Sequence, residues 1–370
     1  MSGTPLTVLF APDSFKGSLS SVEVARALAD GWRRGRPEDR IVLAPLADGG
    51  EGTMEAIAAA GGWEWRKTIA SDPIGRTIEA RWLRSTNGRR AVVELAEAAG
   101  LSRLAPGERD PVGASTRGVG DLIKAALDTG CPEIVLGIGG SATTDGGRAI
   151  LTALGARLGG DRIELGGMDP RLGETALQVA SDVTNPLLGP AGAAATYGPQ
   201  KGASPDQVRE LDAALGVWAD ALETATGRHE RETPGAGAAG GVGFGLLCIS
   251  DRFRSFALRP GVDLVMEATG FEEKLRGANL VITGEGRIDE QTAFGKTALG
   301  VARRAAAAAV PCIAVGGGVT PEGIAVLAEV GATAVPVAEG PMTLDESLAA
   351  GSEPLTRCGE RLARLLGLIS

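Results

Sequence analysis

The residues best suited to chemistry lie in one segment, residues 284–297, which reads GEGRIDEQTAFGKT. It follows the apolar, strand-like run 280–283 and precedes an alanine-rich stretch that we expect to be helical. Glu285, Arg287 and Asp289 therefore meet among glycines at a predicted strand-to-helix junction. A helix N-terminus offers free N–H groups that suit phosphate, and carboxylates can hold a divalent cation. The segment predicts phosphoryl chemistry.

The end of this segment, Gly295-Lys296-Thr297, is similar to the end of a Walker A sequence. A P-loop would place its first glycine at position 290, where this chain has Glu290, and its loop would be shorter. The pattern is therefore not that of a P-loop. Lys296 is therefore a candidate nucleotide contact, but it need not bind the β- and γ-phosphates as a P-loop lysine does.

Polar, glycine-containing loops follow the first two predicted strands. Asp13, Ser14 and Lys16 follow the first strand, and Asp48 and Glu51 follow the second. Loops at the carboxyl ends of strands commonly bind ligands in α/β sheets. The lysine can meet a carboxylate or phosphate as a point charge, and the acids can hold hydroxyls or a metal. The alternatives are a helix-capping loop with an exposed lysine and an ordinary turn.

A glycine-rich loop, residues 137–147, follows a further predicted strand and contains a variant of the dinucleotide fingerprint. That signal is weak, because glycine-rich turns between strands and helices are common. The polar residues inside the loop favour a phosphate cradle over a dinucleotide site, and a purely structural loop is the other alternative. The candidate phosphate contacts are Gly139, Gly140, Ser141, Thr143, Thr144 and Asp145.

Three later features add candidates. Asp182, three residues before Asn185, can coordinate Mg²⁺ or orient a hydroxyl, unless it only forms an Asx turn. Lys201 is offered to an anion by a glycine-flanked loop. Residues 235–245 are dense in glycine, which predicts either a close backbone approach to a nucleotide or a flexible hinge.

Composition excludes several classes of protein. The 370 residues carry a formal net charge of −9 without a visible basic face, which argues against nucleic-acid binding. The single histidine, His229, lies in a charged run, so proton transfer falls to a carboxylate, a lysine or water. Four widely spaced cysteines, no signal peptide and no apolar run of membrane-spanning length predict a cytoplasmic protein.

The order of predicted elements indicates an α/β fold. Strands and helices alternate at both ends of the chain, whereas the middle holds successive strands with a hairpin signal at Asn87-Gly88. We predict a flavodoxin- or Rossmann-like parallel-sheet domain built from both termini, residues 1–65 plus 279–370. Residues 66–278 would form an inserted α/β domain with a mixed sheet, and the site would lie in the cleft between the domains.

Six of these motifs, in this order and over nearly the whole chain, resemble the bacterial type I glycerate kinase family. They are residues 13–18, 47–53, 139–147, 182–186, 198–202 and 283–289. The resemblance implies ATP- and Mg²⁺-dependent phosphorylation of D-glycerate. The product would be 2-phosphoglycerate, as for most members, or 3-phosphoglycerate. It also implies a discontinuous flavodoxin-like domain with an inserted second domain.

The roles that we assign within this framework follow from physical chemistry. Arg287 would bind the glycerate carboxylate because its planar fork matches two oxygens, with Lys16 as second choice. Asp289, or else Asp182, would accept the hydroxyl proton. Asp182 or Glu285 would hold Mg²⁺. The remaining substrate candidates are Asp13, Ser14, Asp48 and Glu51, and the remaining nucleotide candidates are Gly139, Gly140, Ser141, Thr143, Thr144, Asp145, Lys201 and Lys296.

Two other functions compete with this one. An NAD-dependent hydroxyacid dehydrogenase would use the fingerprint at residues 137–142, but such enzymes usually employ a histidine, and His229 is the only one here. A non-catalytic module that senses ATP or glycerate would not need so many acids beside glycine loops. The expected partners are therefore the small molecules D-glycerate and ATP, with no nucleic acid or membrane. The sequence does not predict an oligomeric state.

Overall fold

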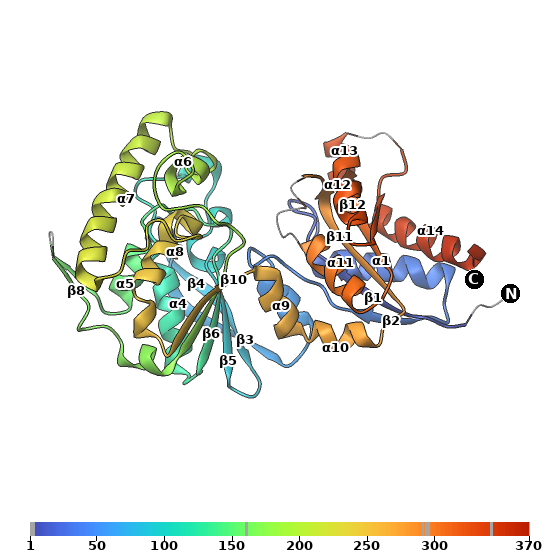
Figure 1. The fold of residues 1–370 in the computed structure, drawn as a ribbon, viewed down its shortest axis with the longest axis horizontal. Helices are drawn as coiled ribbons and strands as arrows, with labels where there is room; N and C mark the ends of the chain where they lie inside the picture. Colours follow the sequence, from blue (N-terminus) through green and yellow to red (C-terminus); the bar gives the residue numbers. More distant parts are fainter. Residues whose placement is uncertain (1–3, 160–161, 291, 293–296, 341–342, 370) are drawn as a thin grey trace. The chain divides into compact units, whose positions relative to one another are not determined.

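A computed structural model describes residues 4–159, 162–290, 292, 297–340 and 343–369 (Figure 1). The predicted site residue Lys296 lies outside these ranges. The chain divides into two compact units, which are described separately. Unit 1 comprises Met1–Asp48, Glu55–Gly61 and Val262–Ser370, and unit 2 comprises Gly49–Met54 and Gly62–Gly261. The predicted boundaries at residues 65 and 278 stay a prediction about independently folding domains.

Unit 1 is built on a five-stranded parallel sheet, in the order β13-β12-β11-β1-β2. This is the flavodoxin-like order, in which the strand sequence reverses direction between the first strand and its later neighbour. Here that switch point falls between β1 and β11. The strands are β1 (Thr7–Pro12), β2 (Arg40–Leu43), β11 (Leu280–Ile288), β12 (Cys312–Val319) and β13 (Thr333–Pro336).

Helices cover both faces of this sheet. Alternate strand residues such as Phe10 and Ile282 pack with Trp32 and Leu355 in a core shared with α1 and α14, and α11 packs on β11 and β12. The helices are α1 (Ser21–Gly35), α2 (Thr53–Ala59), α9 (Gly261–Thr269), α10 (Phe271–Arg276), α11 (Thr297–Ala307), α12 (Pro321–Ala328), α13 (Leu344–Ala349) and α14 (Glu353–Ile369).

Helix α1 begins at a capping box, which the residues Ser20-Ser21-Val22-Glu23 also predict from sequence alone. The Ser20 hydroxyl accepts the Glu23 N–H, and the Glu23 carboxylate accepts the Ser20 N–H at 2.8 Å. Val24, Leu28 and Trp32 then recur at helical spacing and are fully buried. Local sequence therefore sets both the start of the helix and its buried face.

Unit 2 contains a six-stranded mixed sheet, in the order β10-β9-β6-β5-β4-β3. The strands β3, β4 and β5 run antiparallel, with the predicted hairpin turn at Asn87-Gly88, and the others run parallel. The prediction of an α/β chain with one parallel and one mixed sheet is thus confirmed. The strands are β3 (Trp63–Ser71), β4 (Thr77–Ser85), β5 (Arg90–Glu94), β6 (Glu133–Gly137), β9 (Ala176–Ala180) and β10 (Ser255–Arg259), with a separate pair β7 (Arg157–Gly159) and β8 (Arg162–Glu164).

The helices of unit 2 include a long amphipathic one, α7, and the pattern of residues 206–225 also predicts such a helix from sequence alone. They are α3 (Ala96–Ala99), α4 (Arg117–Asp128), α5 (Arg148–Ala153), α6 (Ala193–Tyr197), α7 (Pro205–Thr226) and α8 (Ala238–Cys248). Short 3₁₀ turns occur at Leu101–Arg103, Pro106–Glu108, Pro170–Glu174, Pro199–Lys201 and Ser250–Arg252.

The strand predicted at residues 280–283 is longer in the structure. β11 continues to Ile288 because Glu285 and Arg287 stay in register with Gly316 and Gly318 of β12. The expected strand-to-helix junction is therefore wrong at this point. Both charged residues lie on a strand end, and α11 begins only at Thr297.

The glycines of the dense segment 235–245 pack closely on other backbone, and its roles as a nucleotide contact or a hinge stay predictions. A Cβ on Gly240 would lie 2.0 Å from the Thr143 carbonyl oxygen, and one on Gly245 would lie 2.5 Å from the Gly146 oxygen. The segment enters α8 and presses backbone against backbone on the loop that follows β6. Because glycine has no side chain, the two backbone segments can come this close at these points.

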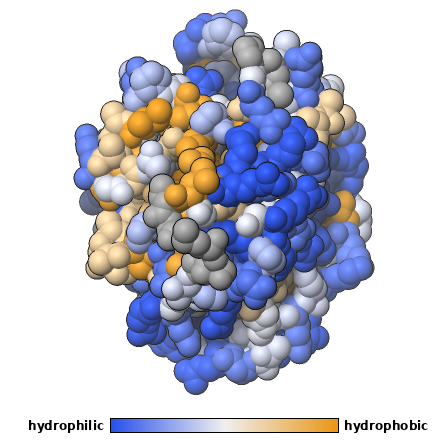
Figure 2. Space-filling view, turned by 90° about the vertical axis from the view of Figure 1, so that its right-hand side faces the viewer, coloured by the Kyte–Doolittle hydropathy of each residue, from blue (hydrophilic) through white to orange (hydrophobic). Residues whose placement is uncertain are grey.

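No helix in the described part of the chain is long and apolar enough to span a membrane. Figure 2 shows a face on which hydrophilic side chains predominate beside a smaller hydrophobic area.

The crossing of α1 and α14 depends on Gly31. A Cβ there would lie 1.8 Å from the Thr356 carbonyl oxygen of α14, so the helices would have to separate. We expect Gly31→Ala to lower the free energy of unfolding by about 1–3 kcal/mol, as measured by urea denaturation. Gly367→Ala, on the same α14 but with nothing within 4 Å, should be neutral or stabilising. Equal effects of both variants would contradict this packing argument.

Candidate active site

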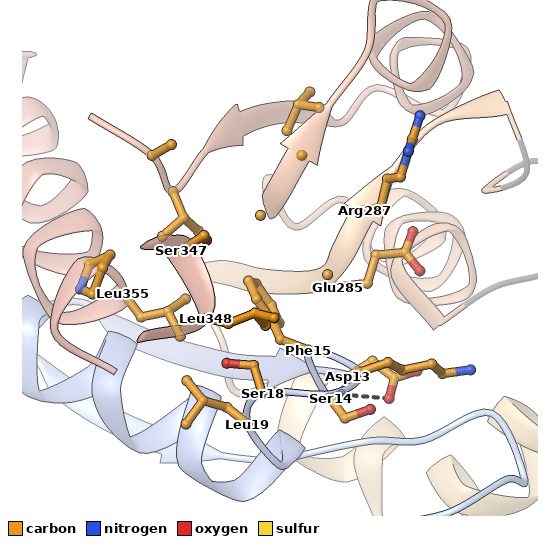
Figure 3. A pocket seen from close by; sticks show the side chains of 18 of the residues that line it. Asp13, Ser14, Phe15, Ser18, Leu19, Glu285, Arg287, Ser347, Leu348 and Leu355 are labelled. Carbon is orange, nitrogen blue, oxygen red and sulfur yellow. Dashed lines mark hydrogen bonds between the residues drawn. The ribbon is translucent and has the colours of Figure 1, made fainter. Parts of the chain in front are cut away.

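A cavity of about 760 Å³ opens in unit 1 at the carboxyl ends of β1, β11 and β12 (Figure 3). This is the sheet edge at the switch point, where open α/β sheets bind their ligands. The loop after β1 and the end of β11 bring charged residues to one part of the cavity. Six predicted site residues line it together: Asp13, Ser14, Lys16, Asp48, Glu285 and Arg287.

Asp13 is a buried carboxylate beneath this cavity, with 6% of its surface exposed. Its Oδ2 accepts the Thr297 hydroxyl at 2.5 Å, and its Oδ1 accepts the Ser14 N–H at 2.6 Å. Burial, together with the nearby charge of Asp48, raises the pKa of Asp13 to about 6. The site therefore holds a carboxylate whose negative charge is only partly compensated.

Lys16 is the cation closest to these acids. Its Nζ lies 3.1 Å from Oδ2 of Asp48, and the attraction of Asp48 raises the pKa of Lys16, aided by Asp13 and Glu285. The Glu285 side chain is buried and its Oε1 accepts the Thr292 hydroxyl at 2.9 Å. The lysine side chain itself is largely exposed, so it can turn toward an incoming anion.

Arg287 and Asp289 form an ion pair, with 2.9 Å between Nε and Oδ2. The guanidinium is 70% exposed, whereas the carboxylate is 14% exposed and so better held. The two residues that the sequence assigned to separate roles are thus partners in this structure. A substrate carboxylate that takes the guanidinium would compete with Asp289 for it.

In unit 2, the Asp145 carboxylate accepts hydrogen bonds from its own loop and from Thr116. Oδ2 accepts the N–H and hydroxyl of Thr116, at 3.0 and 2.7 Å, and Oδ1 accepts the Gly147 N–H at 3.1 Å. Burial raises the pKa of Asp145 against these hydrogen bonds. These contacts give Asp145 a structural role that its sequence context did not indicate.

Lys201 lies under the same loop. It is 2% exposed, and its Nζ donates to the Thr143 carbonyl oxygen at 2.5 Å. Burial lowers the pKa of Lys201 to about 7, although the nearby Asp145 opposes the shift. The buried hydroxyls of Thr143 and Thr144 have no hydrogen-bond partner among the described residues.

The other candidates of unit 2 are also placed by the structure. A Cβ on Gly139 would lie 2.6 Å from Gly50 Cα, so this glycine serves contact between two loops. Asp182 is exposed and its Oδ1 accepts the Gly261 N–H at 2.9 Å. The residues predicted for the site that belong to unit 2 are Glu51, Gly139, Gly140, Ser141, Thr143, Thr144, Asp145, Asp182 and Lys201. Their ligand roles stay predictions.

The sequence analysis missed a buried acid, Glu94, and the apolar residues that line the cavity. Glu94, at the carboxyl end of β5, is 3% exposed, and its Oε1 accepts the Met54 N–H at 2.5 Å. An acid directly after the apolar run 91–93 was a readable signal for it. The apolar part of the cavity, which includes Leu348 and Leu355, carried no such signal.

The fold makes unit 1 a flavodoxin-like parallel α/β unit with a charged cavity at its switch point. A model described as the glycerate kinase family matches residues 8–367. The chain belongs to the glycerate kinase family and is an enzyme of the kinase class, which confirms the resemblance found in the sequence.

Relatives of the chain agree with this assignment over their whole length. It is 42% identical to a glycerate kinase of Halalkalibacterium halodurans, covering 96% of this chain and 97% of that one. It is 40% identical to the glycerate 2-kinase of Escherichia coli K12, covering 98% of each. A Salmonella typhimurium LT2 protein, solved as a candidate glycerate kinase 2, matches with a TM-score of 0.83 and 38% identity over 99% of both chains.

The raised pKa of Asp13 predicts that the free energy of unfolding depends on pH. Between its ordinary value of 3.8 and about 6, the folded chain binds more protons at Asp13 than the unfolded chain, so stability falls as pH rises through this window. Asp13→Asn removes this effect. The stability of the variant relative to the wild type should therefore increase between about pH 4 and pH 7 by up to ~3 kcal/mol, measured by urea denaturation.

Asp30→Asn is the matched control, because Asp30 is an exposed carboxylate on α1. It should show no comparable trend over the same range. A pH-independent difference between Asp13→Asn and the wild type would refute the assignment.

Proposed function

We propose that this protein is an ATP- and Mg²⁺-dependent kinase that phosphorylates D-glycerate and forms 2-phosphoglycerate. The observation that carries the proposal is the cavity at the switch point, where Lys16 and Arg287 meet the carboxylates of Asp13, Asp48 and Glu285. Membership in the glycerate kinase family and the likeness to the E. coli glycerate 2-kinase support the choice of substrate and product.

Arg287 is our candidate for the glycerate carboxylate. Its guanidinium is exposed at the cavity and presents a planar set of donors that can take two carboxylate oxygens at once. The pair with Asp289 holds the guanidinium in place before substrate arrives. Lys16 stays the second choice, since its ammonium can serve either the carboxylate or a phosphate.

Asp289 is our candidate for accepting the proton of the reacting hydroxyl, with Asp182 as the alternative. A glycerate carboxylate that takes the Arg287 guanidinium would bring the substrate next to the Asp289 carboxylate. His229 is 86% exposed and lies in the segment between α7 and α8, which supports a carboxylate in this role. Phosphoryl transfer requires mainly that the reacting groups are held in position and that the charge on the phosphates is neutralised.

Single acids of the cavity are our candidates for magnesium, because the described residues hold no group of three or more Asp, Glu, His or Cys side chains placed to bind a metal ion. Mg²⁺ in kinases is usually bound through one or two carboxylates plus the phosphates, and the cavity offers Asp13, Asp48 and Glu285. Burial, and after it the nearby charge of Asp48, raises the pKa of Asp13, and a bound cation would oppose this shift. Glu285 is our first choice in unit 1, and Asp182 stays a prediction for unit 2. The ion would neutralise charge on the phosphates.

The reaction itself is tested by ADP release coupled to D-glycerate, followed by proton-coupled ³¹P NMR of the product. Phosphate on the secondary hydroxyl couples to one proton and gives a doublet, whereas phosphate on the primary hydroxyl couples to two and gives a triplet. We expect glycerate-dependent ADP release and a doublet. A triplet would indicate the 3-phosphoglycerate alternative, and no release of ADP would overturn the kinase proposal. NADH binding with turnover of a hydroxyacid would favour the dehydrogenase.

Splitting the ion pair should separate its two roles. Arg287→Ala should raise KM for glycerate far more than KM for ATP, because the substrate carboxylate loses its partner. Asp289→Asn should instead lower kcat by ~10²–10⁴, the range for loss of a general base. Steady-state kinetics with both substrates varied measures these constants. An unchanged glycerate KM would remove Arg287 from its role, and a nearly normal kcat would remove Asp289.

A further inference from the structure

The cavity of unit 1 is much larger than the proposed acceptor requires. Its volume of about 760 Å³ lies in the range of sites that hold drug-sized ligands, whereas glycerate is a three-carbon acid. The charged residues line only one end of it. In Figure 3, Asp13, Glu285 and Arg287 lie on one side, and Leu19, Leu348 and Leu355 lie on the other. The second end calls for a larger, partly apolar ligand group.

The walls of this second end come from the last part of the chain. Val337 follows β13 and is buried, Leu355 of α14 is 2% exposed, and Val319 ends β12. Leu348 of α13 also lines the cavity and keeps 40% of its surface exposed. An apolar side chain left open beside buried ones gains stabilisation when a flat hydrophobic group covers it.

One wall is bare backbone. β13 ends at Pro336, opposite Gly316, but β12 continues to Val319, so Gly317 and Gly318 have a strand partner only on the β11 side among the described residues. Neither glycine carries a side chain, and both line the cavity. A planar ring could therefore approach backbone N–H and C=O groups, which a purine can satisfy at its edge.

We infer that the adenosine part of ATP binds at this apolar end of the unit 1 cavity, with its phosphates directed to Lys16. The inference rests on the proposed kinase function and extends it by placing the nucleoside. Residues 139–147 of unit 2 were favoured as phosphate contacts. Within this loop, Gly139 packs on the backbone of Gly50 and Gly146 packs on the ring of Trp218, so contacts within unit 2 already cover these two glycines.

The test introduces a charge on the exposed wall. Leu348→Glu should raise the Kd for ADP about tenfold, measured by isothermal titration calorimetry on the full chain without glycerate, because it exchanges apolar contact for a charge that repels the phosphates. Ile324→Glu on α12 is the matched control. Ile324 is 41% exposed, as against 40% for Leu348, and does not line the cavity, so its Kd should stay within twofold of the wild type.

A second variant tests the backbone wall. A Cβ at position 318 would meet only the Arg287 Cγ, at 3.8 Å, so Gly318→Val should fold normally and also weaken ADP. Circular dichroism checks folding of all three variants, and adenosine alone should compete with ADP. If both Leu348→Glu and Gly318→Val bind ADP as the wild type does, the adenosine site is refuted.

The two proposals can fail independently. Wild-type turnover of D-glycerate together with unchanged ADP affinity in both cavity variants would leave the kinase standing and overturn the nucleoside site. Weakened ADP binding in both variants together with no phosphorylation of D-glycerate would support the nucleoside site and overturn the acceptor. Selective loss of glycerate affinity in Leu348→Glu would overturn the nucleoside site, because that end would then belong to the acceptor.

Discussion

The parallel pairing of β1 with β11 is the constraint on which the site depends. These strands are far apart in sequence, yet the Thr283 hydroxyl donates to the Ala11 carbonyl oxygen at 2.8 Å across 272 residues. The Asp13 N–H donates to the Gly284 oxygen directly beyond, where β1 ends. Without this pairing, Asp13 and Glu285 would not share a cavity. The switch point thus turns two ordinary strand ends into one charged pocket.

A second constraint shapes unit 2, where glycine lets loops pack without side chains. A Cβ on Gly137 would lie 2.5 Å from the Gly49 oxygen, and one on Gly240 would lie 2.0 Å from the Thr143 oxygen. Loops packed this closely leave few ways to move. The buried ammonium of Lys201 adds a fixed hydrogen bond to Thr143. These contacts fix the path of the loop that carries Thr143 and Thr144.

Much of this arrangement could be predicted from the sequence. Apolar runs followed by polar, glycine-containing loops identified the strand ends, and the capping box at Ser20 identified the start of α1. Asp13, Lys16 and Arg287 were found because such side chains after a buried strand seldom serve packing. These predictions work because each depends on a local pattern of a few residues.

What escaped prediction depends on contacts between distant segments. β11 extends to Ile288 because β12 pairs with it, and residues 284–288 alone, with their glycines and charges, read as a loop. From sequence alone, the glycines at 235–245 indicated a ligand site or a hinge. The sequence could not show that they pack on the loop that follows β6. The Arg287–Asp289 pair was missed because no strand was expected at residues 284–288, whereas Arg287 lies on β11 and Asp289 follows directly after its end.

The balance of charge in the cavity bears on the form in which a nucleotide could bind there. Asp13, Asp48 and Glu285 outnumber Lys16, and Arg287 is already matched by Asp289. An anionic nucleotide that entered alone would meet net repulsion from these acids. A nucleotide that arrives with a divalent cation brings the missing positive charge, and the same carboxylates then attract it. An acidic pocket in a chain of net charge −9 therefore suits a metal-bound nucleotide better than a free one.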